Sequence, residues 1–166
     1  MNIDILINDV RWSDLDAGSL FESFIVAVLD HQGLADWQVE VSVLATNDPE
    51  IAALNESFRA KAQPTNVLSW PAKDLAAAQE GELPTKPSAD PDGSIPLGDI
   101  ALSYDTCVRE AADMAKPAQD HMCHLVVHGT LHLLGYDHVR DLDATLMQGI
   151  ETEILGKMGL DDPYRR

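Results

Sequence analysis

Stretches in which apolar and polar residues alternate predict β-strands at four places along the chain. Residues 3–9 begin with such alternation among branched apolar residues, and residues 38–45 alternate along their whole length. Alternation places every second side chain on the same face of a sheet, so one face of each strand is expected to be buried. The stretches 65–70, closed by Pro71, and 97–104 are expected to complete the sheet.

Apolar residues spaced three and four positions apart predict about five helices. They are expected from Asp14 or Asp16 to Gly33, from Asp48 to about Lys61, from Ser103 or Asp105 to Lys116, and over residues 118–134 and 142–157. Asp48 is expected to cap the second helix, because a short acidic side chain can accept the free N–H groups of the first turn. In that helix Ile51, Leu54 and Phe58 share the face expected to meet the core.

Strands gathered early and helices gathered late predict an α+β fold with an approximately four-stranded mixed sheet. At 166 residues the chain is expected to form one domain, residues 1–166, with its own core. Residues 72–96 differ in composition, with four prolines, two glycines and almost no large apolar side chain. They are expected to form a long flexible loop insertion, either a solvated excursion or a flap over a substrate.

The charge balance limits how the protein could bind nucleic acid. The formal net charge of −17 should repel a phosphate backbone at long range, which by itself argues against an RNA enzyme. Any such binding would have to be local and would depend on a few basic residues, such as Arg59 and Lys61.

The two cysteines and the apolar runs indicate the compartment. Cys107 and Cys123 fall among apolar neighbours in helical patterns and are expected to be buried, reduced thiols. Because the sequence shows neither a secretory leader nor an apolar run long enough to cross a bilayer, we expect a cytoplasmic protein without a membrane partner.

Three histidines and a glycine form the strongest chemical signal in the sequence. His128 and His132 are four residues apart and His138 follows six residues later, with Gly135 between them. Residues four apart lie on the same face of a helix, and a glycine can end the helix in the left-handed conformation and let the chain turn back. The pattern predicts that three imidazoles bind one metal ion and leave a fourth position open for water, as in catalytic zinc sites.

The same spacing occurs in the metzincin pattern H-E-x-x-H-x-x-G-x-x-H. The glutamate that acts there as general base is replaced by Gly129. This departure removes the main support for a peptidase, although a metallohydrolase acting on peptides or esters remains an alternative.

The histidine motif also resembles a known family. Residues 128–138, HGTLHLLGYDH, resemble the signature of the YbeY family, metal-dependent endoribonucleases of ribosomal RNA maturation and ribosome quality control. Residues 55–71 are similar to the family pattern N-x-x-[FY]-R-x-K-D-x-P-T-D-V-L-S-F-P, and residues 97–100 match its L-G-D-I. The chain departs from these patterns at Ala62, Asn66 and Trp70.

The resemblance implies a zinc-dependent, single-strand-specific endoribonuclease that matures the 3′ end of small-subunit ribosomal RNA. It implies one zinc ion per chain bound by His128, His132 and His138, with His128 and Arg59 important for catalysis. A guanidinium can bind phosphate oxygens in bidentate fashion and could stabilise charge in the transition state. The implied partners are single-stranded ribosomal RNA and the small ribosomal subunit with its associated proteins.

The function, the metal and the roles of the neighbouring residues stay open at this stage. A non-enzymatic ribosome-assembly factor with a structural metal would also fit the motif, and imidazole ligands suit nickel and copper as well as zinc. His121 and His124 are expected to lie behind the ligands or at the surface, whereas Asp137 could either hydrogen-bond a ligand imidazole or cap the turn.

Overall fold

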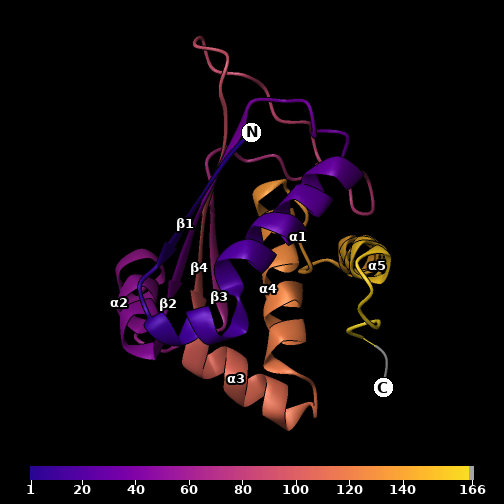
Figure 1. Ribbon diagram of the computed structural model, residues 1–166. Helices are drawn as coiled ribbons and strands as arrows, with labels where there is room; N and C mark the ends of the chain where they lie inside the picture. Colours follow the sequence, from indigo (N-terminus) through magenta and orange to yellow (C-terminus); the bar gives the residue numbers. More distant parts are fainter. Residues whose placement is uncertain (165–166) are drawn as a thin grey trace.

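The computed structural model describes residues 1–164 and shows a central sheet with helices on both faces (Figure 1). The strands are β1 (Asn2–Ile7), β2 (Val39–Thr46), β3 (Val67–Pro71) and β4 (Ile95–Ser103). The helices are the 3-10 helix η1 (Val10–Leu15) and the α-helices α1 (Ala17–His31), α2 (Asp48–Arg59), α3 (Tyr104–Asp113), α4 (Ala118–Leu133) and α5 (Asp141–Lys157).

The sheet has the strand order β1-β2-β4-β3. β1 pairs with β2 and β2 with β4 in parallel, whereas β3 runs antiparallel along β4 and forms an edge of the sheet. The prediction of an α+β fold with a four-stranded mixed sheet is therefore confirmed, and the five predicted α-helices are all present.

A glycine permits the close pairing of β3 with β4. Gly98 has φ +135°, and a Cβ atom at this position would lie 2.1 Å from the carbonyl oxygen of Trp70. Any other residue would push β3 away from β4. Gly98 therefore allows β3 to pair closely at the edge of the sheet.

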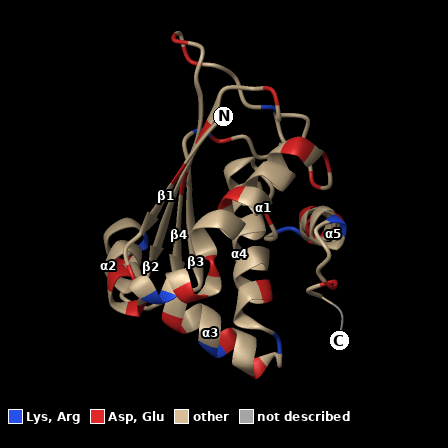
Figure 2. Cartoon of the chain, viewed as in Figure 1, with Lys and Arg blue, Asp and Glu red and all other residues tan. Residues whose placement is uncertain are grey.

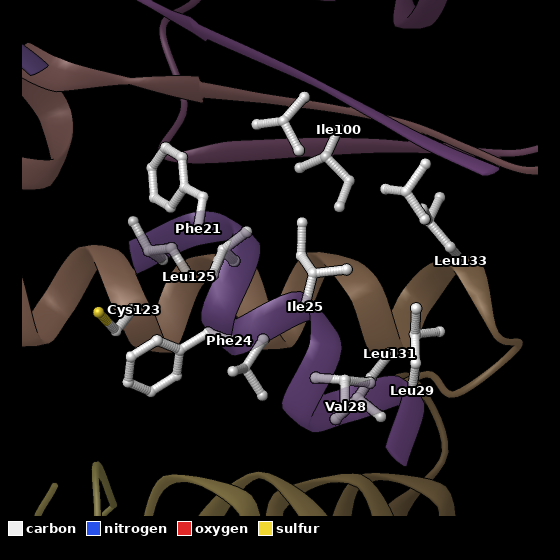
Figure 3. Close-up of a cluster of buried hydrophobic side chains, with 14 of the residues drawn as sticks. Phe21, Phe24, Ile25, Val28, Leu29, Ile100, Cys123, Leu125, Leu131 and Leu133 are labelled. Atoms are coloured by element: carbon white, nitrogen blue, oxygen red, sulfur yellow. The ribbon is translucent and has the colours of Figure 1, made fainter. Parts of the chain in front are cut away.

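The layers follow from the apolar faces of the helices. α2 covers one face of the sheet, α1 and α4 cover the other, and α5 lies on the far side of α1 and α4 (Figure 1). In the main core, Phe21 and Ile25 of α1 lie beside Ile100 of β4 and Leu125 of α4 (Figure 3). α4 is thus enclosed on most of its sides, and it is the helix that carries the first two histidines of the motif.

The structure corrects two predictions about α2. Its cap is Asn47, whose side-chain oxygen accepts a hydrogen bond from the Glu50 N–H at 3.2 Å, and not Asp48. Phe58 does not face the core: it is 65% exposed and packs edge-to-face on Trp70, with 5.5 Å between the ring centroids. The helix ends at Arg59, one turn beyond its last buried residue, Asn55. The side chains of its last turn therefore face solvent.

The start of α1 also differs from the prediction. Asp16 precedes the helix but adopts the left-handed conformation, with φ +56°, and its side chain makes no capping hydrogen bond. The unpredicted helix η1 comes first and buries Trp12, whose Nε1–H donates to the Thr46 carbonyl at 2.8 Å. A six-residue 3-10 helix with one buried aromatic residue is too short to show an amphipathic period in the sequence.

The connection between β3 and β4 spans residues 72–94, because β4 begins at Ile95. The structure describes this whole connection and shows no helix or strand within it. Leu75 is nevertheless buried, so part of the connection packs against the body of the protein.

Acidic side chains are spread over helices and loops, and basic ones are few (Figure 2). Within residues 1–164, none of the helices combines the length and the apolar character needed to cross a bilayer.

Both cysteines are free and buried, as predicted. Burial raises the pKa of each thiol, Cys107 and Cys123, to about 12. Because the thiolate is the reactive form, we expect iodoacetamide at pH 8 to leave both cysteines unmodified in the native protein and to modify both in denaturant. Intact-mass spectrometry would measure this, and rapid native labelling at either cysteine would contradict the buried placement.

Candidate metal centre and adjoining cavity

The first two histidines of the motif lie one turn apart on α4, and a glycine ends the helix after them. Gly135 has φ +100°, and a Cβ atom there would lie 2.7 Å from the backbone carbonyl of Leu75. The left-handed conformation and this close approach both exclude a side chain. The chain then reverses and carries His138 back towards α4.

The three imidazoles converge as the spacing predicted. The Nε2 atoms of His128 and His132 are 3.0 Å apart. The ring of His138 lies 5.2 Å from that of His128 and 5.0 Å from that of His132, measured between centroids. One ring nitrogen from each of the three residues lies within 4.8 Å of the others, so one ion can contact all three.

Hydrogen bonds on the outer side of two rings select the nitrogen that faces the cluster. His128 Nδ1 is hydrogen-bonded to Oε1 of Glu151, and His132 Nδ1 lies 2.9 Å from the carbonyl oxygen of Tyr136. An ionised carboxylate and a carbonyl only accept hydrogen bonds, so each Nδ1 carries the proton. The Nε2 lone pairs of both histidines are then free for a cation, which is the usual arrangement around metal-binding histidines.

Glu151 of α5 is a residue that the sequence analysis missed. It is completely buried, and it also hydrogen-bonds His124 Nε2 at 3.1 Å and the hydroxyl of Tyr164. Burial alone would raise the pKa of this carboxyl, but the hydrogen bonds from His124 and His128 outweigh it and hold the pKa at about 2. A signal for it existed, because a charged residue four positions after Met147 interrupts the apolar face of α5.

His132 is held in the neutral form that a metal ligand requires. Burial, helped by the neighbouring His128 and His138, lowers the pKa of His132 to about 4. Three neutral imidazoles with a supporting carboxylate suit zinc, nickel or copper better than magnesium or calcium, which prefer oxygen ligands. The residues present therefore fit the kind of metal that the motif implies.

The packing around Gly129, which follows the first histidine, disfavours a catalytic glutamate at this position. Gly129 lies on the side of α4 that packs against the sheet, and a Cβ atom there would meet Ile100, Ser69 and Val67 at 3.1 to 3.2 Å. A carboxylate at this position would be buried against β3 and β4. This packing counts against a peptidase that depends on a glutamate next to its first ligand.

The histidines line a cavity of about 580 Å³. β3 and the residues before it contribute Asn66 and Ser69, α2 contributes Arg59, and the connection after β3 contributes Lys73. The Arg59 guanidinium lies 3.4 Å from the carbonyl oxygen of Ser69. The structure thus brings Arg59 and the three histidines, widely separated in sequence, to the walls of one hollow.

Three polar residues near the cluster, Asp137, His121 and Asn66, make hydrogen bonds within the protein. The Asp137 carboxylate accepts a hydrogen bond from the His138 N–H at 2.7 Å, which closes the turn. His121 lies 2.9 Å from Glu110, one turn further from the cluster than His124. Asn66 donates to the same Glu110 at 3.0 Å, which a carboxylate in its place could not do.

Removal of the buried carboxylate should weaken metal binding. In Glu151→Ala the Nδ1–H of His128 loses its acceptor, and zinc affinity is expected to fall by about 10- to 100-fold. Glu153→Ala is the matched control, because Glu153 lies on the same helix but is 55% exposed and pairs with His31. Competition with a chromophoric chelator would measure both variants. Equal zinc affinities would show that Glu151 does not support the ligand.

The mixed sheet with a histidine cluster on a helix and its following turn defines the class: a small α+β protein with a three-histidine candidate metal centre. The family model described as Endoribonuclease YbeY matches residues 2–159, and the chain belongs to this family.

Several relatives carry the same name. A protein of Ruegeria pomeroyi named Endoribonuclease YbeY is 54% identical over 99% of this chain and 98% of its own. One of Paracoccus denitrificans is 49% identical over 98% of this chain and 89% of its own. The solution structure of TM1509 from Thermotoga maritima shares the fold, with a TM-score of 0.55 and 22% identity over 99% of both chains. The predicted family membership is confirmed.

Proposed function

We propose that the protein is a zinc-dependent endoribonuclease that cleaves single-stranded RNA during maturation of the 3′ end of small-subunit ribosomal RNA. The family supplies the reaction class, since its relatives are named endoribonucleases. The ribosomal substrate, the small-subunit partner and the single-strand preference extend the resemblance found in the sequence.

One observation carries the proposal. His128 and His132 present paired Nε2 atoms 3.0 Å apart, and the cavity that these histidines line with His138 also contains Arg59. A bound cation and the Arg59 guanidinium could contact the negatively charged phosphodiester from two sides of the cavity.

Zinc, Arg59 and Glu151 have different roles in the proposed reaction. Zinc, when bound, supplies Lewis acidity towards a phosphate oxygen and towards water. Arg59 can bind a phosphate oxygen pair and stabilise the charge that develops on it. Glu151 cannot take a proton from substrate, because it is completely buried behind His128 and hydrogen-bonds the outer nitrogen of that ring.

The placement of positive charge supports local recognition on an acidic protein. Arg59 and Lys73 line the cavity together with Asp74 and Asp137, and Lys73 already pairs with Asp90 at 3.0 Å. The local attraction for phosphate therefore depends on Arg59 and the bound cation, in a chain with a formal charge of −17. Long-range repulsion and local attraction together favour RNA that is delivered to the cavity, for instance on the ribosome, over RNA met by chance.

The test compares metal content and substrate preference in one preparation. Protein purified without chelator should contain one zinc per chain and cleave a single-stranded RNA carrying the 3′ region of small-subunit ribosomal RNA. The same RNA annealed to its complement should resist cleavage. Stoichiometric zinc without cleavage of either RNA would favour an assembly factor whose metal is structural.

A further inference from the structure

Residues 75–81, in the first half of the β3–β4 connection, lie against the segment that carries the third histidine. Leu75 is buried next to Gly135, whose position would admit no Cβ atom because of the Leu75 backbone. Leu75 and Ala76 also line the cavity that contains the histidine cluster. This part of the connection, called the brace below, therefore belongs to the wall of the site.

The brace is tied to the start of α5 by hydrogen bonds in both directions. Arg140 donates to the carbonyl oxygens of Ala77 at 2.9 Å and Ala78 at 3.2 Å. Asp143 accepts from the Gly81 N–H at 2.8 Å and from Arg140 Nε at 2.5 Å.

Glu80 supplies the cap that α5 does not provide for itself. The residue at the N-cap position, Arg140, makes no side-chain capping hydrogen bond. Glu80 Oε2 instead accepts the Leu142 N–H at 2.8 Å. A carboxylate at this end of a helix satisfies a free backbone donor and interacts favourably with the helix dipole.

The start of α5 matters for the metal centre at two points. His138 lies only three residues before Asp141, the first residue of the helix. Ten residues further along the same helix, Glu151 holds the outer nitrogen of His128. A shift of α5 would therefore move His138 and Glu151 together.

We propose that the brace positions His138 and Glu151 for metal binding, and that Glu80 is the positioning residue on which it depends. This inference rests on the proposed zinc site. It assigns the first half of the connection a role in holding that site from outside the histidine motif.

Three variants separate capping from charge. Glu80→Ala removes the acceptor for Leu142 N–H, whereas Glu80→Gln keeps an amide oxygen in its place. Glu82→Ala removes the same charge from an exposed position two residues away. We expect zinc affinity, measured by chelator competition, to fall about 10-fold in Glu80→Ala and to stay near wild type in Glu80→Gln and Glu82→Ala.

Cobalt substitution supplies a readout that loss of stability alone would not change. The visible spectrum of the cobalt-loaded Glu80→Ala variant should differ from that of the wild type, because His138 is no longer held in place. Thermal unfolding of the metal-free proteins would be recorded beside it.

The outcomes are distinct. If the wild type binds no zinc, the metal site fails and the brace fails with it. If wild type and Glu80→Ala bind zinc equally and give the same cobalt spectrum, the zinc site stands and the brace proposal is overturned. The brace proposal is also overturned if Glu80→Ala unfolds at a lower temperature but keeps the zinc affinity and cobalt spectrum of the wild type.

Discussion

Replacing His132 with alanine is expected to remove zinc from the protein and to reduce RNA cleavage to the background of the assay. His132 Nε2 lies 3.0 Å from that of His128, so the substitution removes a donor from the centre of the cluster. Two imidazoles bind zinc much less tightly than three, and the proposed reaction depends on the ion. Elemental analysis and a single-stranded RNA assay on the same sample would measure both losses.

The matched control is His31→Ala. His31 lies at the end of α1 and pairs with Glu153 at 3.3 Å, away from the cluster. This variant should keep its zinc and its activity. Cleavage that persists in rigorously purified, zinc-free His132→Ala protein would indicate a contaminating nuclease and would remove the support for the proposed activity.

Arg59→Ala should lose most of its cleavage activity but retain its zinc, in contrast to His132→Ala, which loses both. Arg59 lines the cavity but belongs to α2, so its removal leaves the histidines and their outer hydrogen bonds intact. Loss of a group that stabilises developing charge typically lowers the rate by about 10²- to 10³-fold. Rates under single-turnover conditions, together with zinc content, would measure the effect.

A second arginine provides the control for charge. Arg109 is 59% exposed and lies on α3, where it pairs with Asp48 at 3.6 Å. Arg109→Ala alters the net charge equally and should cleave at the wild-type rate. Equal rates in Arg59→Ala and wild type would exclude Arg59 from the mechanism, and Arg59→Lys would show how much depends on bidentate geometry.

The sequence predicted those parts of the site whose geometry is local. His128, His132, Gly135 and His138 lie within eleven consecutive residues, made of less than two helical turns and a reversal, so their spacing already determines that they can meet. Helical periodicity and alternation likewise predicted most of the strands and helices to within a few residues, although the capping residues Asp16 and Asp48 were wrong. Phe58 was misplaced because helical periodicity identifies a face but does not show where the neighbouring layer ends.

The parts that escaped prediction depend on contacts between distant segments. Glu151 reaches His128 only because α5 packs against α4, and Glu80 reaches Leu142 only because the connection folds back over that helix. Neither contact is indicated by a short-range pattern of residues in the sequence. The composition of residues 72–96 suggested a solvated insertion or a flap over substrate. The hydrogen bonds that hold the first half of this segment involve backbone groups, which composition does not describe.

The division of the cavity between two distant stretches of chain has an evolutionary consequence. The histidines and Glu151 fall within residues 128–151, whereas Arg59 approaches from α2 across the edge strand β3. Retention of the ion and recognition of the phosphate can therefore drift independently among descendants of this fold. A descendant could keep the complete histidine cluster long after it had lost Arg59 and with it the proposed cleavage of RNA.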